Sequence, residues 1–264
     1  MKRKYYIITV CIIALLYLYD QYKEQKKEQE PQNTEVASQV SNKNTVELNT
    51  SQKGLLRYEG YVVSYNEKNL IPNWVSYELT AQETNGQYTR NGLVFRQDPK
   101  AKVAQSSNDD YKNSGWSRGH MAPAGDFKWS DNAMEETFYF TNCCPQNQLL
   151  NAGQWSTLEK KVRDWAKKYG SVTVVTGPLI WENEHGTIGA NKVVVPDAFF
   201  KAILAGEQSI AFVMYNRPEN ENMQKCAMTV DKLESITGFD FFAELDDTQE
   251  SRIESTYTLK FWNL

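Results

Sequence analysis

The chain of 264 residues contains only two histidines, and one of them, His120, stands in a setting suited to proton transfer. It follows Arg118 and Gly119 directly. A neutral imidazole has an ordinary pKa near 6.5, so it takes a proton from water close to physiological pH, and the Arg118 charge could hold an anion beside it. We therefore predict that His120 is a general base whose activity falls on the acid side of about pH 6. The alternative is a structural histidine bonded to backbone. The other histidine, His185, is expected to be an exposed loop residue.

A second group of candidate residues lies at the start of a predicted helix, residues 153–169. Asn151 immediately precedes this helix, where Asn is also a favoured N-cap, so capping is its alternative role. Glu159 falls within about 40° of the centre of the apolar stripe, and its carboxylate should therefore point inward. A buried carboxylate needs a partner, which metal-bound water or an arginine would supply. The alternative is a Glu at the edge of the stripe that pairs with Arg163 one turn later.

Composition removes several other kinds of site. Two histidines and four cysteines, one of them in the N-terminal apolar stretch, exclude a multi-histidine or four-cysteine zinc site in the remaining chain. The sequence also lacks a G-x-S-x-G elbow, a Walker A loop and a G-x-G-x-x-G turn. A formal net charge of -4 means that a nucleic acid would have to be held by a local basic site or a metal ion rather than by bulk charge.

Three stretches match, in order and spacing, the motifs D-R-G-H-x-A-P, N-x-x-P-Q and N-x-G-x-W-x-x-L-E. These stretches are residues 117–123, 142–146 and 151–159. Together they resemble the DNA/RNA non-specific endonucleases, which form a ββα-metal (His-Me finger) group. Ser117 departs from the pattern because it stands where the family has Asp, and loss of that carboxylate is expected to alter the support of the site. The resemblance covers about residues 61–241.

The resemblance implies an α+β fold with a mixed or antiparallel central sheet and a ββα-metal active site. It implies that Asn151 is the only protein ligand of a Mg²⁺ ion, with water and phosphate oxygens in the other positions, and Mn²⁺ is possible. Mg²⁺ indeed tends to keep several waters. Glu159 would position metal-bound water. The implied activity is hydrolysis of phosphodiester bonds in DNA and RNA, which leaves 5′-phosphate ends.

The resemblance also assigns roles to three further residues. Arg90 matches an arginine that contacts the scissile phosphate, although Arg96 is a nearby alternative and either could be a solvated surface charge. Arg118 matches an arginine that supports the site and binds substrate, with a structural salt bridge as its alternative. Asn142 matches an asparagine that helps to orient the catalytic histidine, and a turn role before Pro145 is equally natural.

Two other classes of function remain open at this point. One is an exported binding module that keeps the fold and has lost catalysis, for which Ser117 is the only support. The other is an acyl hydrolase that uses Ser117 with His120, three residues apart and without an elbow. Cys143 and Cys144 are adjacent, and an exported protein could bridge one of them to Cys226.

The N-terminal segment predicts location rather than fold. Basic residues at positions 2–4 precede an uncharged apolar run, residues 5–19, as in a signal peptide or signal anchor. The run is shorter than the roughly 20 residues that span a bilayer, and no small-x-small cleavage site follows it. We predict that residues 1–20 form an N-terminal anchor, and we favour its retention over cleavage. Residues 21–53 should form a polar flexible tether, and residues 54–264 one catalytic domain. This domain should face out of the cytoplasm, or be secreted or periplasmic if the N-terminal segment is cleaved.

Hydrophobic periodicity within 54–264 predicts mixed strands and helices without a βαβ rhythm. The predicted strands are 61–65, 74–79, 138–140, 171–175, 193–195, 199–204 and 210–215. The predicted helices are 153–169, closed by Gly170, and 230–236, stopped by Gly238. Residues 100–115 are polar and are expected to form a loop.

Overall fold

The structure is a computed structural model that describes residues 46–47, 54–218 and 222–264. The predicted anchor, residues 1–20, and nearly all of the predicted tether, residues 21–53, lie outside the described residues. Within the described ranges, no helix has the length and apolar character needed to cross a bilayer.

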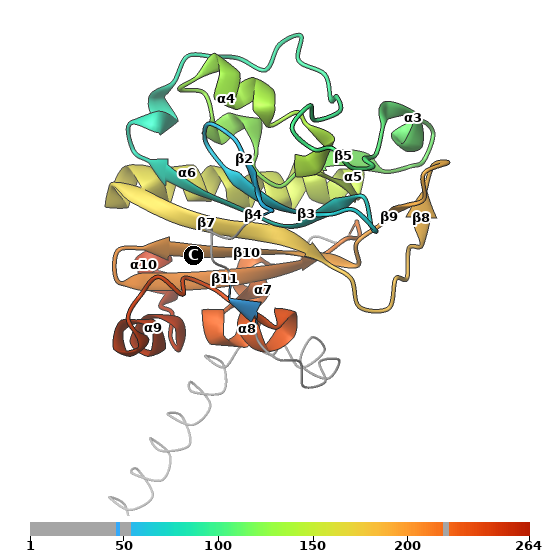
Figure 1. The fold of residues 1–264 in the computed structure, drawn as a ribbon. Helices are drawn as coiled ribbons and strands as arrows, with labels where there is room; N and C mark the ends of the chain where they lie inside the picture. The colour runs from blue at the N-terminus through green and yellow to red at the C-terminus, as the bar shows by residue number, and fades with distance from the viewer. Residues whose placement is uncertain (1–45, 48–53, 219–221) are drawn as a thin grey trace, which may run out of the picture. The chain divides into compact units, whose positions relative to one another are not determined.

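Seven strands form the central sheet, in the order β12-β11-β10-β7-β4-β3-β2 (Figure 1). Every neighbouring pair is antiparallel. The strands are β2 (Leu56–Arg57), β3 (Val62–Asn66), β4 (Ile71–Thr80), β7 (Ser171–Leu179), β10 (Ala198–Ala205), β11 (Gln208–Tyr215) and β12 (Ala227–Met228). The central strands are buried on both faces, which explains their nearly continuous apolar sequences. The predicted α+β class with an antiparallel central sheet is confirmed.

Shorter elements surround this sheet. The helices are α3 (Asn108–Tyr111), α4 (Asp131–Glu136), α5 (Gln148–Leu150), α6 (Ser156–Tyr169), α7 (Met223–Cys226), α8 (Val230–Thr237), α9 (Asp247–Glu254) and α10 (Leu259–Trp262). Three 3-10 turns are η1 (Glu83–Asn85), η2 (Ala124–Asp126) and η3 (Phe140–Asn142), and a π-helical turn, η4 (Asn151–Trp155), joins α5 to α6. Two antiparallel hairpins pair β5 (Ser117–His120) with β6 (Cys143–Gln146) and β8 (Thr187–Ile188) with β9 (Val193–Val194), and β1 (Val46–Glu47) runs parallel to β13 (Phe239–Asp240).

The two faces of the sheet carry different helices. Helix α6 lies along one face and packs against β4, β7 and β10, whereas α8 and α9 lie on the opposite face (Figure 1). The side chains of β10 alternate between these layers, because successive residues of a strand point to opposite faces. Phe199 and Ile203 belong to the core under α6, and Phe200 and Ala202 to the core with α8.

The ends of the two predicted helices follow from local sequence. Gly170 has φ +94° directly after α6, and Gly238 has φ +69° directly after α8, so both occupy conformations that glycine adopts without strain. Thr229 caps α8, since its Oγ1 accepts a hydrogen bond of 3.1 Å from the Lys232 amide. These boundaries agree with the sequence within a few residues.

One predicted strand is wrong. Residues 138–140 do not form a strand, because Phe140 begins the 3-10 turn η3, and only Tyr139 makes an isolated bridge, to Arg96. The amide of Asn142 closes the turn on the Tyr139 carbonyl, and its side chain bonds to the Thr137 carbonyl. These local hydrogen bonds of Asn142 take the place of the backbone hydrogen bonds that a paired strand would make. The predicted loop 100–115 also contains the short helix α3.

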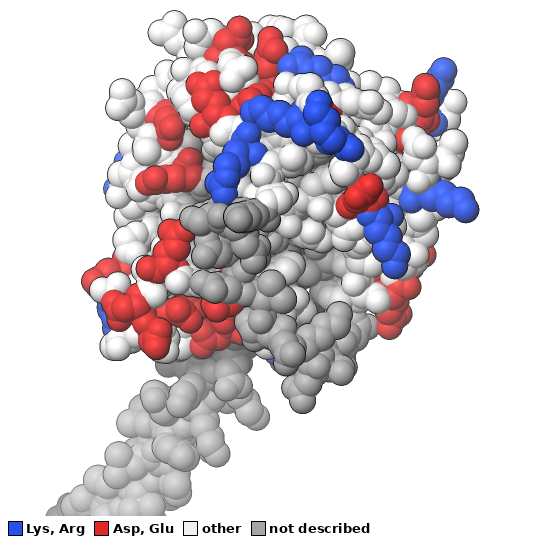
Figure 2. All heavy atoms as spheres, in the orientation of Figure 1, with Lys and Arg blue, Asp and Glu red and all other residues white. Residues whose placement is uncertain are grey.

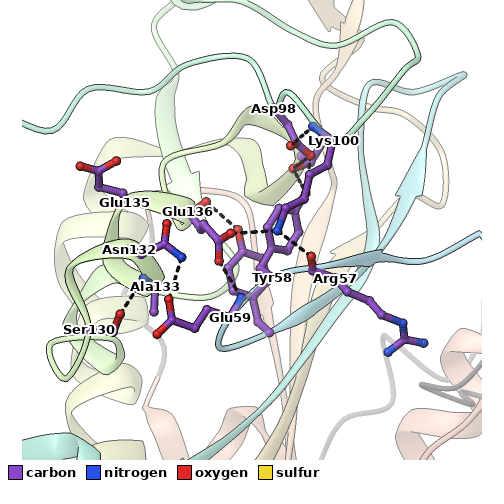
Figure 3. A network of polar contacts seen from close by, with 12 residues as sticks. Arg57, Tyr58, Glu59, Asp98, Lys100, Ser130, Asn132, Ala133, Glu135 and Glu136 are labelled. Carbon is purple, nitrogen blue, oxygen red and sulfur yellow. Dashed lines mark hydrogen bonds and ion pairs between the residues drawn. The ribbon is translucent and has the colours of Figure 1, made fainter.

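A network of polar contacts fixes α4 above the edge of the sheet (Figure 3). Lys100 Nζ bonds to Glu136 Oε1 at 2.9 Å and to the Arg57 carbonyl at 2.8 Å. Glu136 Oε2 accepts the Glu59 amide at 2.6 Å, and Tyr58 donates to Asp98. The network joins β2 and the following turn to the end of α4. It therefore holds the segment that leads into the aromatic residues around His120.

Candidate active site

A two-stranded hairpin followed by a helix carries most of the candidate residues. In this hairpin His120 lies opposite Cys143, and Arg118 lies opposite Pro145. The chain then leaves β6 and enters α5, η4 and α6, so the order is strand, strand, helix. Because strand side chains alternate, Arg118 and His120 share one face while Ser117 and His120 point to opposite faces. That alternation removes the support for a Ser117–His120 nucleophile pair.

The ring of His120 is enclosed by aromatic side chains. Its exposed fraction is 9 %. Phe95 packs at 4.6 Å and Phe138 meets it edge-on at 4.9 Å between ring centroids. No described residue forms a hydrogen bond with its Nε2, so the structure does not show the backbone bond expected of a structural histidine at that atom.

Burial first, and then the Arg90 charge, lower the pKa of His120 from 6.5 to about 3. The imidazole is therefore neutral throughout the physiological range and available to accept a proton. This corrects the expectation of an acid limb near pH 6, which assumed an ordinary imidazole. The sequence contained no measure of how deeply the ring would be buried.

Asn142 holds the chain that follows His120 rather than the imidazole itself. Its Oδ1 accepts the Ala122 amide at 2.8 Å, and its Nδ2 donates to the carbonyls of Ala122 and Thr137, each at 2.9 Å. Its own carbonyl accepts the Met121 amide at 3.0 Å. The side chain is fully buried, so these bonds fix the direction in which the chain leaves β5.

Asn151 does not cap a helix. Asn147 takes that role, since its Oδ1 accepts the amides of Leu149 and Leu150 at 2.9 and 3.3 Å. Asn151 instead opens the π-helical turn η4, in which Gly153 has non-helical angles of φ -100° and ψ -105°. Such turns within helices frequently occur at functional sites.

Asn151 is one of the residues that line an open pocket of about 500 Å³. Its carboxamide makes no hydrogen bond to the side chain or backbone of any other described residue. The pocket is lined by Phe95, Tyr111, Asn113, Gly115, Trp116, Ser117, Arg118, Gln148 and Asn151. Phe95 lines this pocket and also packs against the His120 ring, so it links the two candidate groups.

The three candidate arginines have different surroundings. Arg96 forms an ion pair of 2.9 Å with Glu135. Arg90 is exposed, lies over the Phe138 ring at 5.4 Å, and its charge acts on both His120 and Glu159. Arg118 lies over the Tyr111 ring, donates to the Asn108 carbonyl at 3.1 Å, and has no acidic partner within the described part of the chain. The alternative of a structural salt bridge for Arg118 is therefore wrong.

Glu159 lies one helical turn after Trp155, on the half-buried side of α6. Arg163 does not take it as a partner, because Arg163 NH1 pairs with Asp126 Oδ1 at 2.6 Å. The expected alternative, a Glu159–Arg163 pair at the edge of the stripe, is wrong. Burial raises the pKa of Glu159, and the nearby charges of Lys201, Asp126, Arg163 and Arg90 act on the same carboxylate.

Sequence reasoning missed two charged residues beneath this helix. Asp126 is fully buried and accepts a hydrogen bond of 2.8 Å from Tyr77 in addition to the Arg163 pair. Lys201 is fully buried in β10. The available signal was a single lysine within an otherwise apolar strand, and an aspartate at the end of the histidine motif.

The comparison with protein families decides the relationship. The model of the DNA/RNA non-specific endonuclease family matches residues 39–248. The chain belongs to this endonuclease family. The residues matched include the whole hairpin and helix that carry His120 and Asn151.

Individual members of the family support this assignment. The mitochondrial nuclease EXOG of Xenopus laevis is 37% identical over 209 residues, which are 72% of this chain and 58% of that protein. The human mitochondrial endonuclease G is 33% identical over 200 residues, 69% of this chain and 67% of the relative. Nuclease C1 of Cunninghamella echinulata var. echinulata is 34% identical over 213 residues, which are 74% of this chain and 84% of that protein. The chain thus spans less than two thirds of the length of its EXOG relatives.

A solved structure of the family shares the fold. The crystal structure of the EndoG/EndoGI complex matches with a TM-score of 0.72 and 30% identity, and the match covers 79% of this chain and 94% of that chain. The agreement extends over most of the solved chain. The arrangement of hairpin, helix and antiparallel sheet described above is therefore that of an endonuclease of this family.

Members of this endonuclease family typically use a divalent metal ion. The residues present fit such an ion. Asn151 offers an amide oxygen that accepts no hydrogen bond from a described residue. Glu159 supplies a carboxylate that also has no hydrogen-bonded partner among the described residues. Oxygen donors of this kind are the ligands that Mg²⁺ prefers.

Two remaining expectations concern a histidine and three cysteines outside this group of residues. His185 is half-buried rather than exposed, because its ring packs against Trp116 at 5.1 Å between centroids. Cys143, Cys144 and Cys226 are buried, and no disulfide joins any two of them. Burial raises the pKa of Cys143 to about 12, so this thiol is protonated at neutral pH.

Proposed function

We propose that this chain is a Mg²⁺-dependent endonuclease that hydrolyses phosphodiester bonds of DNA and RNA and leaves 5′-phosphate ends. The observation that supports it most directly is the neutral imidazole of His120, whose Nε2 has no hydrogen-bond partner among the described residues, in the hairpin that leads into the helical segment where Asn151 lines a pocket. Family membership supports a nucleic acid as the substrate, and Mn²⁺ could replace Mg²⁺.

In this proposal each side chain has one task. His120 accepts the proton of the attacking water, and Asn142 keeps the segment after His120 in place. Arg90 and Arg118 bring positive charge to the phosphate, which does not depend on base sequence. A divalent ion held by Asn151 would stabilise negative charge on the phosphate and on the departing 3′ oxygen. Glu159 accepts hydrogen bonds from water next to the site.

The low overall charge fits contact with phosphates rather than tight duplex binding. The chain has a net charge of -4, so only local cations such as Arg90 and Arg118 attract the backbone. Raised salt should weaken such binding, because contacts to phosphates release counterions.

We further propose that the N-terminal segment directs export, with residues 5–19 as a membrane anchor or, after cleavage, with release of the domain. The basic flank followed by an apolar run supports this. The EXOG and endonuclease G relatives are named as mitochondrial proteins, so a mitochondrial location is the competing outcome. Fractionation of the source cells with an antibody against the domain distinguishes the two.

The deciding experiment is nicking of supercoiled plasmid DNA by the purified protein. We expect cleavage in Mg²⁺, none in EDTA, and a loss of about 10²–10⁴-fold in His120→Ala, the range for removal of a general base. The matched control is His185→Ala, the same change at the other histidine, which should retain cleavage. Cleavage that is equal in EDTA, or that survives in His120→Ala, would contradict the proposal. A folded protein without any cleavage would favour the binding module.

A further inference from the structure

Three carboxylates from two helices meet on the face of the sheet opposite α6. Asp231 and Glu234 are three residues apart in α8 and therefore lie on one face of that helix. Glu254 is the last residue of α9, which lies on the same face of the sheet as α8 (Figure 1). One oxygen from each of the three carboxylates lies within 4.8 Å of the oxygens from the other two. The proposed nuclease mechanism uses none of these residues.

The burial of Glu254 is a separate indication that this place binds a ligand. Its side chain is 1 % exposed, and its Oε1 has no hydrogen-bond partner among the described residues. A buried polar atom normally has a partner, and glutamate is almost never fully buried without one. The strongest electrostatic neighbours of Glu254 are all acidic, namely Glu234, Glu250, Asp231 and Asp240. A buried carboxylate oxygen in these surroundings lacks a positively charged partner.

The described part of the chain does not supply this positive charge. Arg252, two residues before Glu254, pairs instead with Glu207 at 3.2 Å. No lysine or arginine of the described residues forms an ion pair with any of the three carboxylates. Glu234 is held in place by one oxygen, since its Oε1 accepts the Phe241 amide at 2.8 Å. Its other oxygen is therefore available to a ligand.

The spacing of the oxygens fits a calcium ion. Ca²⁺ binds six to eight oxygen ligands at about 2.3–2.6 Å, so two of its ligands are at most about 5 Å apart. The three carboxylate oxygens, none more than 4.8 Å from another, meet this condition. Mg²⁺ usually keeps several waters and binds one or two carboxylates, so a set of three favours calcium. Because Asp231 is exposed, water can reach the site and supply further ligands.

We propose that Asp231, Glu234 and Glu254 bind a Ca²⁺ ion that joins α8 to α9. The ion is structural, because α6 and the Asn151 segment that leads into it are on the other side of the sheet. Helix α8 packs against β10 and β11, and α9 packs against β11. A cation shared by the two helices therefore fixes the C-terminal helices against the same strands.

The first test is isothermal titration calorimetry with CaCl₂ on the full chain after removal of metal by EDTA and dialysis. Titrations are made at pH 8, because binding requires the carboxylate form of Glu254 and displaces a proton from this group. The unmodified protein and Asn151→Ala should both bind calcium at this site. Asn151→Ala removes the proposed ligand of the catalytic ion, so calcium that it retains is bound elsewhere.

Three variants test the ligands one by one. Glu254→Gln keeps the size of the buried side chain and should weaken calcium binding by at least about tenfold, since affinity depends on the number of charged ligands. Asp231→Asn should have a similar effect, and its exposed position makes it independent of any folding defect in Glu254→Gln. Glu250→Gln is the matched control. It removes an acidic residue one turn earlier in α9, outside the three carboxylates, and should weaken binding by less than about threefold.

Thermal unfolding gives a second measurement on the same proteins. Calcium at about 100 times its Kd should raise the unfolding midpoint of the unmodified protein by about 5–10 °C. Glu254→Gln and Asp231→Asn should show no such rise, whereas Glu250→Gln should retain it. In EDTA, Asp231→Asn should unfold within about 2 °C of the unmodified protein, because an exposed substitution changes stability little.

Two results would overturn the inference. One is the absence of calcium binding in Asn151→Ala, which would place any bound calcium at the candidate active site. The other is an affinity that Glu254→Gln and Asp231→Asn leave unchanged, or that Glu250→Gln lowers as much as they do. None of these measurements follows DNA cleavage, so they decide the calcium site whether or not the proposed nuclease activity is found.

Discussion

Two groups of acidic side chains lie on opposite faces of the same sheet, and their surroundings differ. The first, which we call the α6-side charge group, consists of Asp126, Glu159, Arg163 and Lys201. Its two cations, Arg163 and Lys201, come from α6 and from β10. Burial raises the pKa of Asp126, but the Arg163 pair and the Tyr77 hydrogen bond oppose this effect.

The second, the α8–α9 acid group, consists of Asp231, Glu234 and Glu254, whose carboxylate oxygens lie within 4.8 Å of one another. Acidic side chains gather over this end of the molecule (Figure 2). Glu254 is 1 % exposed, and its Oε1 has no hydrogen-bond partner in the described part of the chain. Burial and the negative charges of Glu234, Glu250, Asp231 and Asp240 raise the pKa of Glu254 to about 9.

The difference shows what burial does to a carboxyl group with and without cations. Glu254 lacks a neighbouring positive charge among its strongest electrostatic neighbours, and it therefore holds a proton at neutral pH. Asp126 is more deeply enclosed and still has a cation at 2.6 Å. On the α6 face, the charges of Arg163 and Lys201 oppose this effect of burial and favour the ionised carboxylates.

The largest expected effect comes from breaking the ion pair in the α6-side charge group. Asp126→Asn leaves Arg163 beside a neutral amide, and removal of one partner of a buried pair costs about 3–5 kcal/mol. Because Arg163 is 21% exposed, we expect the lower end of this range in urea unfolding at pH 7. Asp231→Asn, on the exposed member of the α8–α9 acid group, should change stability by less than about 0.5 kcal/mol.

A second variant shows whether the cost comes from an unpaired charge. In Asp126→Asn combined with Arg163→Met, both charges are absent, and the loss of stability should be smaller than in Asp126→Asn alone. Equal stability of Asp126→Asn and the unmodified protein would show that the pair does not stabilise the fold.

A smaller effect is expected from the pH dependence of the α8–α9 acid group. The pKa of Glu254 is about 9 in the folded protein and about 4.3 in an unfolded chain. Between these values the folded state binds more protons, so the stabilisation from this group is complete below about pH 4 and is lost as pH rises toward 9.

Glu254→Gln should remove this dependence. Between pH 7 and pH 8 the unmodified protein should lose about 1 kcal/mol more unfolding free energy than Glu254→Gln, below the limit of about 1.4 kcal/mol per pH unit for one proton. Urea titrations at both pH values measure the difference, and Glu67→Gln at an exposed site serves as the control. A slope that Glu254→Gln leaves unchanged would show that Glu254 is not the group that titrates.

The smallest effect concerns His120, a buried group beside a single exposed cation. Its pKa of about 3 results mainly from burial and only secondarily from Arg90. Arg90→Gln should therefore raise the pKa by less than about one unit. Because the chain has only two histidines, imidazole NMR resolves the signal, which His120→Ala identifies. The control is Arg96→Gln, which removes an arginine paired with Glu135 and should leave the titration of His120 unchanged. A midpoint near 6.5 for His120 in the unmodified protein would contradict the prediction that burial lowers its pKa.

The sequence determined those features that depend on local patterns. The strands β4, β7, β10 and β11 follow from apolar runs and alternation, because a strand buried on one or both faces needs such residues. Helix α6 and its end at Gly170 follow from a periodicity of 3.6 residues and from glycine at a positive φ. The motif spacing singled out His120 and Asn151, which the structure places in the β5–β6 pair and at the start of the helical segment that follows it.

The tertiary structure alone decided the electrostatic environment. Asp126 and Arg163 are 37 residues apart in the sequence, and no local pattern predicts that they pair. The same holds for Lys201 over Trp155 and for Phe95 against His120. Desolvation and Coulomb energy depend on which distant side chains surround a group and on how much water they exclude. For this reason the sequence could identify His120 as a candidate base, whereas its pKa and the partners of the buried carboxylates required the folded chain.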